Sequence, residues 1–186
     1  MSTKPDMILT VRDLDLMPDD GKRYEVIDGE LFVSKTPGLF HQLISGTIYS
    51  SFDSYLKENP IGKVVSTPGV ILSDMDGVIP DLIFISLEKL AAAVESDRIH
   101  GAPELVVEIL SPGSDNARRD RIAKLYLYAK FGVGEYWIVD PETRTIELYI
   151  RSGNNLILSG TFGAADKISS TMLPGYSCNV ADLFAI

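Results

Sequence analysis

A carboxylate stands inside one of the most apolar stretches of the chain. In PELVVEIL, residues 103–110, Glu108 lies between Val107 and Ile109. Burying an ionised side chain costs several kcal/mol unless a cation or hydrogen-bond donors compensate for the lost hydration. Glu108 therefore needs a partner, and the nature of that partner bears on what the protein does.

A second acid, Asp81, lies at the start of another apolar stretch, IPDLIFIS, residues 79–86. Side chains alternate between the two faces of a strand, so Asp81 shares a face with Ile83. If the two strands are antiparallel neighbours, Asp81 meets Glu108. The two carboxylates then repel one another unless a cation such as Mg²⁺ or Mn²⁺ lies between them. The alternative is that each acid faces water or pairs with an arginine of the following helix.

A lysine, Lys124, is the candidate cation supplied by the protein. In the helix predicted after Glu108 it shares one stripe with Asp120, Leu127 and Phe131. Apolar neighbours on its C-terminal side would turn it toward the strand acids. The alternative is an exposed pair with Asp120. For a lysine linked to solvent, we expect Lys124→Ala to move the thermal midpoint by only a few degrees.

Two further residues are weaker candidates. Glu25, in YEVIDG, could add an acid to a metal site or could face solvent from a hairpin. His41 begins a long helix, where it could shuttle protons or serve as a capping or core histidine. Four aromatic residues are expected in the core or on a sheet face, with base stacking as a minor alternative: Tyr126, Tyr128, Tyr136 and Trp137.

A sheet with helices packed on it must position these residues. A hairpin is predicted over residues 22–35, with its turn at Asp28-Gly29, a dipeptide that tolerates positive φ angles. An amphipathic helix is predicted over residues 38–59, and its apolar stripe is Leu39, Leu43, Ile44, Ile48, Phe52, Tyr55 and Leu56.

The remaining pattern alternates strands and helices. In chain order it predicts strands over residues 62–74 and 78–86, a short helix or irregular segment over 87–97, a strand over 102–110, a loop over 111–116, a helix over 117–131, a hairpin over 134–152 and a strand over 155–162. This order predicts an α/β or α+β fold whose central strands carry Asp81 and Glu108, preceded by an extra hairpin.

The composition is that of a folded protein. The 186 residues, 45% of them hydrophobic and 23% charged, can bury one core, so we expect a single domain over residues 1–186. No apolar run reaches the roughly 20 residues of a membrane span, and the acidic start lacks the pattern of a signal peptide, so a cytoplasmic location is expected. Besides His41, the soft ligands are Cys178 and His100, too few for a structural zinc site. Any metal should therefore be held mainly by oxygen.

The charge balance bears on the partners. A formal net charge of -9 argues against an unspecific binder of polyanions, which usually has a basic footprint. A local basic patch, or else a solvated helix face, is supplied within seven positions by Arg118, Arg119, Arg121 and Lys124.

Taken together, the motifs resemble a known group of nucleases. Pro80-Asp81 followed by VVEIL with Glu108 is similar to the signature of the PD-(D/E)XK nuclease superfamily, although the lysine expected at position 110 is replaced by Leu110. The run from RYEVIDGEL through PDLIFIS, VVEILSPGS, RDRIAKLYLYAKFGVGEYWIVDP and LPGYS resembles the Uma-type restriction endonuclease family of that superfamily, over about residues 10–184. In that family the lysine lies on the following helix, which matches Lys124.

The resemblance implies a restriction-endonuclease-like mixed sheet and a metal-dependent endonuclease that cleaves DNA. Asp81 and Glu108 would hold Mg²⁺ or Mn²⁺ with the Ile109 carbonyl as a third oxygen, and Lys124 would orient the attacking water. A homodimer is expected, because two active sites related by a two-fold axis can cut two antiparallel strands. The rival hypothesis is a noncatalytic binding or assembly module that retains the nuclease fold.

Overall fold

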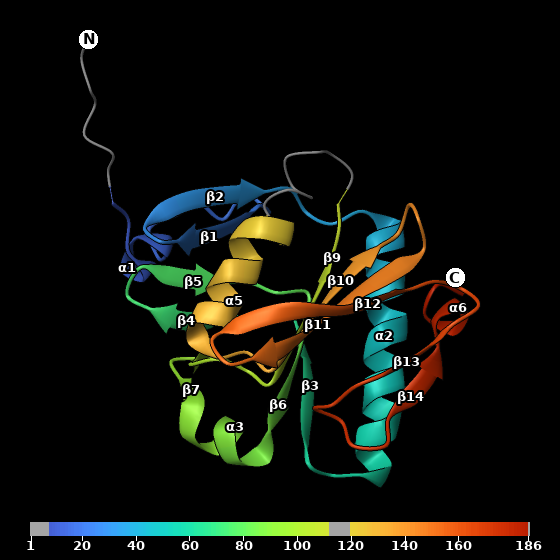
Figure 1. Ribbon diagram of the computed structural model, residues 1–186. Coiled ribbons are helices and arrows are strands. Elements are labelled where there is room, and N and C mark those ends of the chain that lie inside the picture. Colours follow the sequence, from blue (N-terminus) through green and yellow to red (C-terminus); the bar gives the residue numbers. More distant parts are fainter. Residues whose placement is uncertain (1–7, 112–119, 186) are drawn as a thin grey trace.

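The computed structural model describes residues 8–111 and 120–185, and two six-stranded sheets form its framework (Figure 1). We call the first the hairpin sheet; its strands, in spatial order, are β2 (Glu30–Ser34), β1 (Arg23–Ile27), β5 (Asp76–Val78), β4 (Val70–Ser73), β8 (Arg98–His100) and β7 (Val94–Glu95). We call the second the central sheet; its order is β12 (Asn155–Phe162), β11 (Thr145–Ser152), β10 (Glu135–Asp140), β9 (Leu105–Ile109), β6 (Leu82–Ser86) and β3 (Gly62–Ser66).

Both sheets are mixed. In the central sheet β9 pairs with β10 in parallel and with β6 in antiparallel fashion. A separate pair of strands, β13 (Lys167–Ser169) and β14 (Ser177–Asn179), lies near the C-terminus. The helical segments are α1 (Val11–Leu14), α2 (Leu39–Glu58), α3 (Leu87–Ala93), the π-helix η1 (Asp120–Lys124), α5 (Leu125–Phe131) and α6 (Val180–Leu183). The predicted mixed α/β architecture is confirmed.

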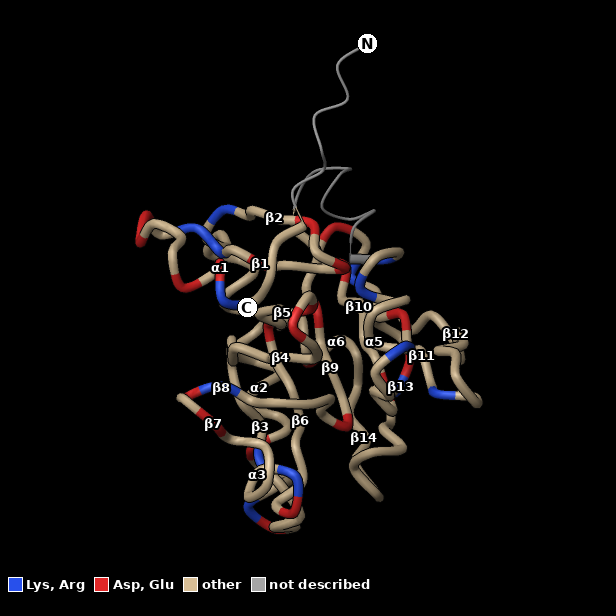
Figure 2. Tube along the Cα trace, turned by 90° about the vertical axis from the view of Figure 1, so that its left-hand side faces the viewer, with Lys and Arg blue, Asp and Glu red and all other residues tan. Residues whose placement is uncertain are grey.

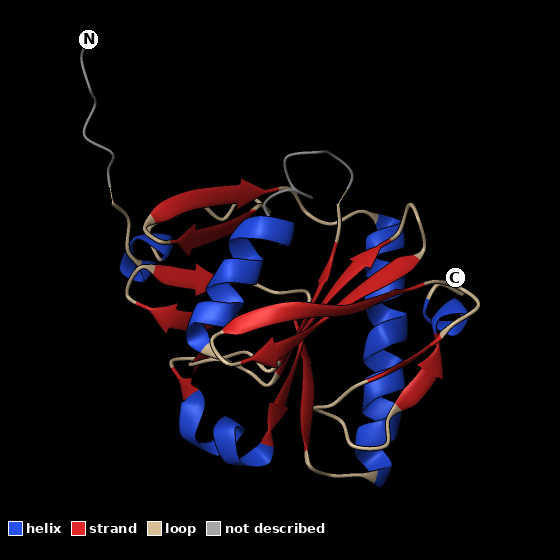
Figure 3. Ribbon diagram, in the orientation of Figure 1, coloured by secondary structure: helices blue, strands red, loops and turns tan. Residues whose placement is uncertain are grey.

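The central sheet separates two hydrophobic cores. Alternate residues of β9, such as Leu105 and Val107, pack in one core with α2 and α6. On the opposite face, Val106 packs in a second core with α5 and the hairpin sheet. Figure 3 shows α2 and α5 on different sides of these strands. Glu108 belongs by alternation to the face of Val106, so the acid points into the layer between the central sheet and the hairpin sheet.

The N-terminal hairpin is confirmed, and its strands are part of the six-stranded hairpin sheet. Ile27 pairs with Glu30 across a two-residue turn, in which Asp28 has φ 49° and Gly29 has φ 79°. Positive φ at both central residues is the geometry that Asp-Gly favours. Val26 of β1 also pairs with Gly77 of β5, so the hairpin forms one side of a complete sheet.

Helix α2 is also confirmed, but its apolar stripe was predicted too broadly. Ile44, Ile48 and Phe52 are buried, whereas Leu39 and Leu43 are exposed. Leu39 lies in the first turn of α2, before the buried residues begin at His41, and Leu43 lies outside the buried face of the helix.

The predicted strands over residues 62–74 and 78–86 were wrong as single elements. Thr67 has φ 49° and is followed by Pro68-Gly69, so the chain turns between β3 and β4 and passes from the central sheet to the hairpin sheet. Pro80 interrupts the second segment, because proline has no N–H to donate to a ladder. Of the segment 78–86, only Val78 belongs to β5 in the hairpin sheet, and residues 82–86 form β6 in the central sheet.

Two helix predictions also change. The segment 87–97 is helical only in α3, after which the short strands β7 and β8 follow. Of the helix predicted over residues 117–131, positions 117–119 lie outside the described residues, and the described part begins as the π-helix η1 before it continues as α5. Single π turns inside α-helices occur frequently at functional sites.

Charges of both signs share the surface. Figure 2 shows basic and acidic positions close together around α3 and around α1. Among the described residues, no helix is long and apolar enough to cross a membrane.

Candidate active site

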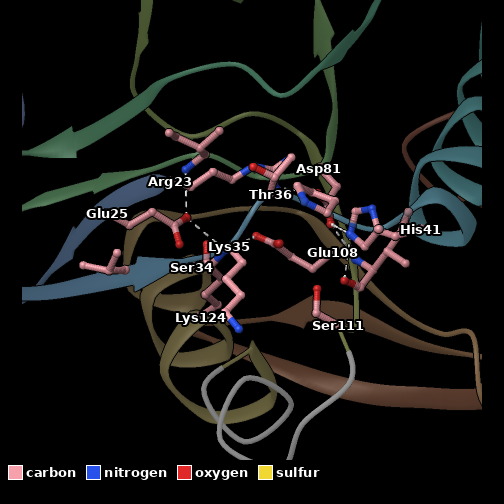
Figure 4. Close-up of a pocket in the computed structure, with 15 residues that line it drawn as sticks. Arg23, Glu25, Ser34, Lys35, Thr36, His41, Asp81, Glu108, Ser111 and Lys124 are labelled. Atoms are coloured by element: carbon pink, nitrogen blue, oxygen red, sulfur yellow. Dashed lines mark hydrogen bonds and ion pairs between the residues drawn. The ribbon is translucent and has the colours of Figure 1, made fainter. Parts of the chain in front are cut away.

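All five predicted site residues line one pocket of about 420 Å³, together with the main chain of Ile109 (Figure 4). They come from different parts of the fold: Glu25 from β1, His41 from α2, Asp81 from the bend before β6, Glu108 from β9 and Lys124 from η1. The pocket therefore lies where the hairpin sheet, the central sheet and two helical segments meet.

The two acids face each other across neighbouring strands. Leu82 of β6 pairs with Val107 of β9 in antiparallel register. Asp81 precedes Leu82, and Glu108 follows Val107. In an antiparallel pair these two acids are opposite one another and on the same face. Both side chains are buried. The predicted adjacency of Asp81 and Glu108 is thus present in the fold.

Asp81 accepts hydrogen bonds from three donors. Its Oδ1 lies 2.8 Å from an Arg23 guanidinium nitrogen, and its Oδ2 accepts from the Ile109 N–H at 2.9 Å and from His41 Nε2 at 3.0 Å. Burial raises the pKa of Asp81, but the hydrogen bonds from His41 and Arg23 outweigh it, so the pKa is lowered. Asp81 is therefore held as a carboxylate.

His41 acts as a donor in this arrangement. Its Nε2 lies 3.0 Å from Asp81 Oδ2 and 3.1 Å from the Ile109 carbonyl oxygen. Both neighbours are acceptors, so Nε2 must carry the proton. Nδ1 is buried and has no hydrogen-bond partner. Because the nitrogen that reaches the pocket already carries a proton, the geometry favours a positioning role for His41 over proton shuttling.

Glu108 is paired with the predicted lysine. Lys124 Nζ lies 2.7 Å from Glu108 Oε1, and the same oxygen accepts from the Tyr128 hydroxyl at 2.7 Å. Burial raises the pKa of Tyr128 well above its usual value, and the charge of Glu108 adds to this effect, so the hydroxyl stays protonated and donates. Lys124 is only 2% exposed. The alternative of an exposed helix lysine is therefore wrong.

Glu25 completes the lysine's surroundings. Its Oε1 lies 3.0 Å from Lys124 Nζ and also accepts from the Ile79 N–H at 2.9 Å. The side chain is buried, so the alternative of a solvent-facing hairpin residue is wrong as well. Lys124 bridges an acid of the hairpin sheet and an acid of the central sheet.

Two residues of this cluster were not predicted as site residues. Arg23 stands two positions before Glu25 on β1 and thus on the same face, and Tyr128 stands four positions after Lys124 on one helical stripe. These spacings were the signal that could have found them. Arg121, from the proposed basic patch, instead pairs with Glu147 and lies 3.8 Å from Asp140. Arg118 and Arg119 lie outside the described residues.

Acids and cations of the protein face one another in the pocket, where Asp81 contacts Arg23 and Glu108 contacts Lys124. In residues 8–111 and 120–185, no group of three or more His, Cys, Asp or Glu side chains stands ready to hold a metal ion. The pocket does offer two opposed carboxylates and the Ile109 carbonyl, which are hard oxygen ligands. With ordinary ionisation, the three acids and the two cations Arg23 and Lys124 leave one negative charge.

Comparisons with known proteins show the family and the fold of the chain. A family model, Uma2, described as "Putative restriction endonuclease", matches residues 11–181. Among solved structures the chain is similar to a "putative nuclease belonging to DUF820 from Anabaena variabilis ATCC 29413", with a TM-score of 0.78 and 19% sequence identity over 95% of this chain and 98% of that chain. That likeness shows the fold. No curated protein matches the chain.

Proposed function

The chain belongs to the Uma2 family, described as "Putative restriction endonuclease", and from this membership we propose that it is an endonuclease that hydrolyses DNA phosphodiester bonds with Mg²⁺ or Mn²⁺ as cofactor. One observation carries the proposal: Asp81 and Glu108 face one another on the same side of the central sheet, with Lys124 Nζ 2.7 Å from Glu108. This constellation combines two acids with one ammonium in a single pocket.

The residues that would hold the cation are Asp81, Glu108 and the Ile109 carbonyl. When bound, a divalent cation polarises the phosphoryl group and makes bound water more acidic. The pocket's single negative charge favours such a cation. Addition of two positive charges would leave the pocket with one, which suits the anionic phosphodiester of the substrate.

Lys124 would supply the protein's own contribution at the reacting phosphate. Its ammonium has three donors, and its ion pairs direct it toward Glu108 and Glu25. The ammonium can orient water or a phosphate oxygen, and its positive charge opposes the negative charge that develops in the transition state. The η1 turn brings this group to the acids from a helix, which accounts for Leu110 at the strand position.

Arg23 would balance the charge of Asp81. The guanidinium lies 2.8 Å from Asp81 Oδ1 and is partly exposed to the pocket. An arginine remains charged at all working pH values and keeps further donors available after one contact. Arg23 can thus hold Asp81 in place and interact with a phosphate oxygen at the same time.

Plasmid nicking tests the proposal. Wild-type protein should nick supercoiled DNA across a range of Mg²⁺ and Mn²⁺ concentrations. Glu108→Gln, purified identically, should lose the activity, and Lys124→Gln should lower the rate by about 10²-fold or more. Glu104→Gln is the matched control, because Glu104 precedes the same strand but lies outside the pocket. If wild type and Glu108→Gln nick alike, the activity is contamination and the noncatalytic alternative replaces the nuclease.

A homodimer is part of the same proposal. The described part of each chain contributes one pocket of this composition, and a double-strand break requires two cleavage events on antiparallel strands. A two-fold axis between two copies would present one pocket to each strand.

A further inference from the structure

We propose that Lys35 binds a backbone phosphate of the DNA substrate beside the phosphate that reacts, and so sets the position of the strand in the pocket. The inference rests on the proposed function, since it concerns the substrate of the same pocket. Lys35 would be a positioning residue, outside the cluster of buried acids and cations described above.

One wall of the pocket is a continuous stretch of chain. Residues 33–38, which join the end of β2 to the start of α2, all line the pocket, and Figure 4 shows Ser34, Lys35 and Thr36 among its side chains. Lys35 carries the charge of this stretch, and the residues on either side of it carry hydroxyl groups. Lysine ammonium groups and the hydroxyls of serine and threonine are among the groups that contact phosphate oxygens of DNA. The wall therefore has the composition of a phosphate-binding segment.

Lys35 differs from the other two cations that line the pocket. Arg23 and Lys124 are each paired with buried carboxylates. Lys35 is exposed, and it forms no ion pair with a carboxylate of residues 8–111 and 120–185. A phosphate can therefore contact the Lys35 ammonium without breaking an existing ion pair.

The charges of the pocket lie at different depths. Glu25, Asp81 and Glu108 are buried, whereas Lys35 is exposed to solvent. Each strand of a DNA duplex carries one negative charge per nucleotide, about 3.4 Å apart along the helix axis. A strand that places one phosphate at the buried acids therefore holds the next phosphate nearby, outside the acid cluster. Lys35 supplies a cation for that second phosphate.

The wall is anchored on both sides of Lys35. Ser34 pairs with Arg23 across the N-terminal hairpin. The Thr36 hydroxyl donates a hydrogen bond to the Gly21 carbonyl oxygen. Because the main chain is held by these contacts, phosphate binding has to immobilise only the Lys35 side chain, which keeps the entropic cost of binding small.

The first test is the salt dependence of DNA binding by the full-length protein. A fluorescein-labelled duplex is titrated by fluorescence anisotropy in EDTA, which prevents metal-dependent cleavage, at salt concentrations between about 50 and 200 mM. Each phosphate neutralised by a lysine contributes about -0.9 to the slope of log K against log salt concentration. Lys35→Gln should therefore reduce the magnitude of the slope by about 0.9. Over that fourfold range of salt, wild type should lose about 3.5-fold more affinity than the variant.

Lys63 provides the matched control. It is exposed and forms no ion pair with a described carboxylate, as Lys35 does, but it lies on β3 and outside the pocket. Lys63→Gln should keep the wild-type slope. Lys35→Arg should also keep it, because a guanidinium contacts phosphate as well. If Lys63→Gln lowers the slope as much as Lys35→Gln does, the effect is one of net charge and the inference is overturned.

Chemical labelling gives an independent readout on the wild-type protein. Acetic anhydride acetylates exposed lysine amines, and mass spectrometry measures the extent of acetylation at each lysine. Bound duplex should reduce the acetylation of Lys35 several-fold and leave that of Lys63 unchanged. This measurement needs no variant, so it does not depend on the folding of one.

The outcomes separate this inference from the proposed function. If the wild-type protein nicks plasmid but Lys35→Gln keeps the wild-type slope, or bound DNA leaves Lys35 fully open to acetylation, this inference is overturned and the proposed function stands. If no duplex binds in either EDTA or Mg²⁺, both fail. A slope lowered in Lys35→Gln alone, together with protection of Lys35 by DNA, establishes the phosphate contact.

Discussion

Replacing Lys124 with methionine should destabilise the protein far more than the loss of an exposed lysine would. The ammonium lies between two buried carboxylates, 2.7 Å from Glu108 and 3.0 Å from Glu25. Methionine fills most of the same volume, so the main cost is electrostatic. Removing one partner of a buried ion pair costs about 3–5 kcal/mol. For a protein of this length, that corresponds to a fall of roughly 6–20 °C in the thermal midpoint.

This expectation replaces the sequence-based one, in which Lys124→Ala moved the midpoint by only a few degrees. That reasoning assumed a solvent-linked ammonium, and Lys124 is buried. Differential scanning calorimetry should compare Lys124→Met with Lys57→Met, since Lys57 is an exposed helix lysine paired with Asp53 at i,i+4. The Lys57 variant should melt close to wild type.

The pH dependence gives a second test of the same reasoning. Without Lys124, the two desolvated acids favour uptake of a proton, so the folded variant binds more protons than its unfolded chain. Stability then falls as pH rises, so the gap to wild type should widen with rising pH. Adding Glu25→Gln should recover part of the loss. A Lys124→Met protein that melts like wild type, with a gap independent of pH, would refute the buried ion-pair argument.

Three other predictions follow from the site and the proposed assembly. Because the pKa of Asp81 is lowered, its ionised form stabilises the fold above the ordinary carboxyl pKa, and this contribution is lost as pH falls through the lowered value. The free energy of unfolding of Asp81→Asn, measured in urea, should therefore vary less with pH below about pH 4 than that of wild type. Tyr128→Phe removes a donor to the buried Glu108 and should cost about 1.5–3 kcal/mol in urea unfolding, and a change below experimental error would show that the hydroxyl contributes nothing. Sedimentation equilibrium should give twice the 20.4 kDa chain mass, and a monomer at all concentrations would exclude the proposed homodimer.

The sequence predicted which residues lie together in the pocket better than it predicted the strands around them. Asp81 and Glu108 could be placed together because side chains alternate strictly along a strand, so a correct face follows from a correct strand even when its ends are wrong. The division of residues 62–74 and 78–86 between two sheets could not be foreseen. This division depends on the φ angle of 49° at Thr67 and on the interruption at Pro80. The segments on either side of each break are similarly apolar, so local hydrophobicity does not reveal that they belong to different sheets.

The surroundings of the acids were harder to predict for a different reason. The partners of Lys124 come from β1 and β9, some 100 and 16 residues away in the chain, and no local pattern reports such contacts. The charge of Arg23 was visible in the sequence. Its pairing with Asp81, 58 positions away, became evident only with the packing of the hairpin sheet against the central sheet.

Two main-chain N–H groups donate hydrogen bonds to carboxylates of the pocket. The Ile79 N–H donates to Glu25 and the Ile109 N–H donates to Asp81, so each proton lies against a carboxylate oxygen of the site. Any ligand that draws charge from these carboxylates should change the nuclear shielding of the attached amide protons. A two-dimensional ¹H–¹⁵N correlation spectrum should therefore register occupancy of the pocket at Ile79 and Ile109 separately, which provides one resonance on each side of the junction between the two sheets.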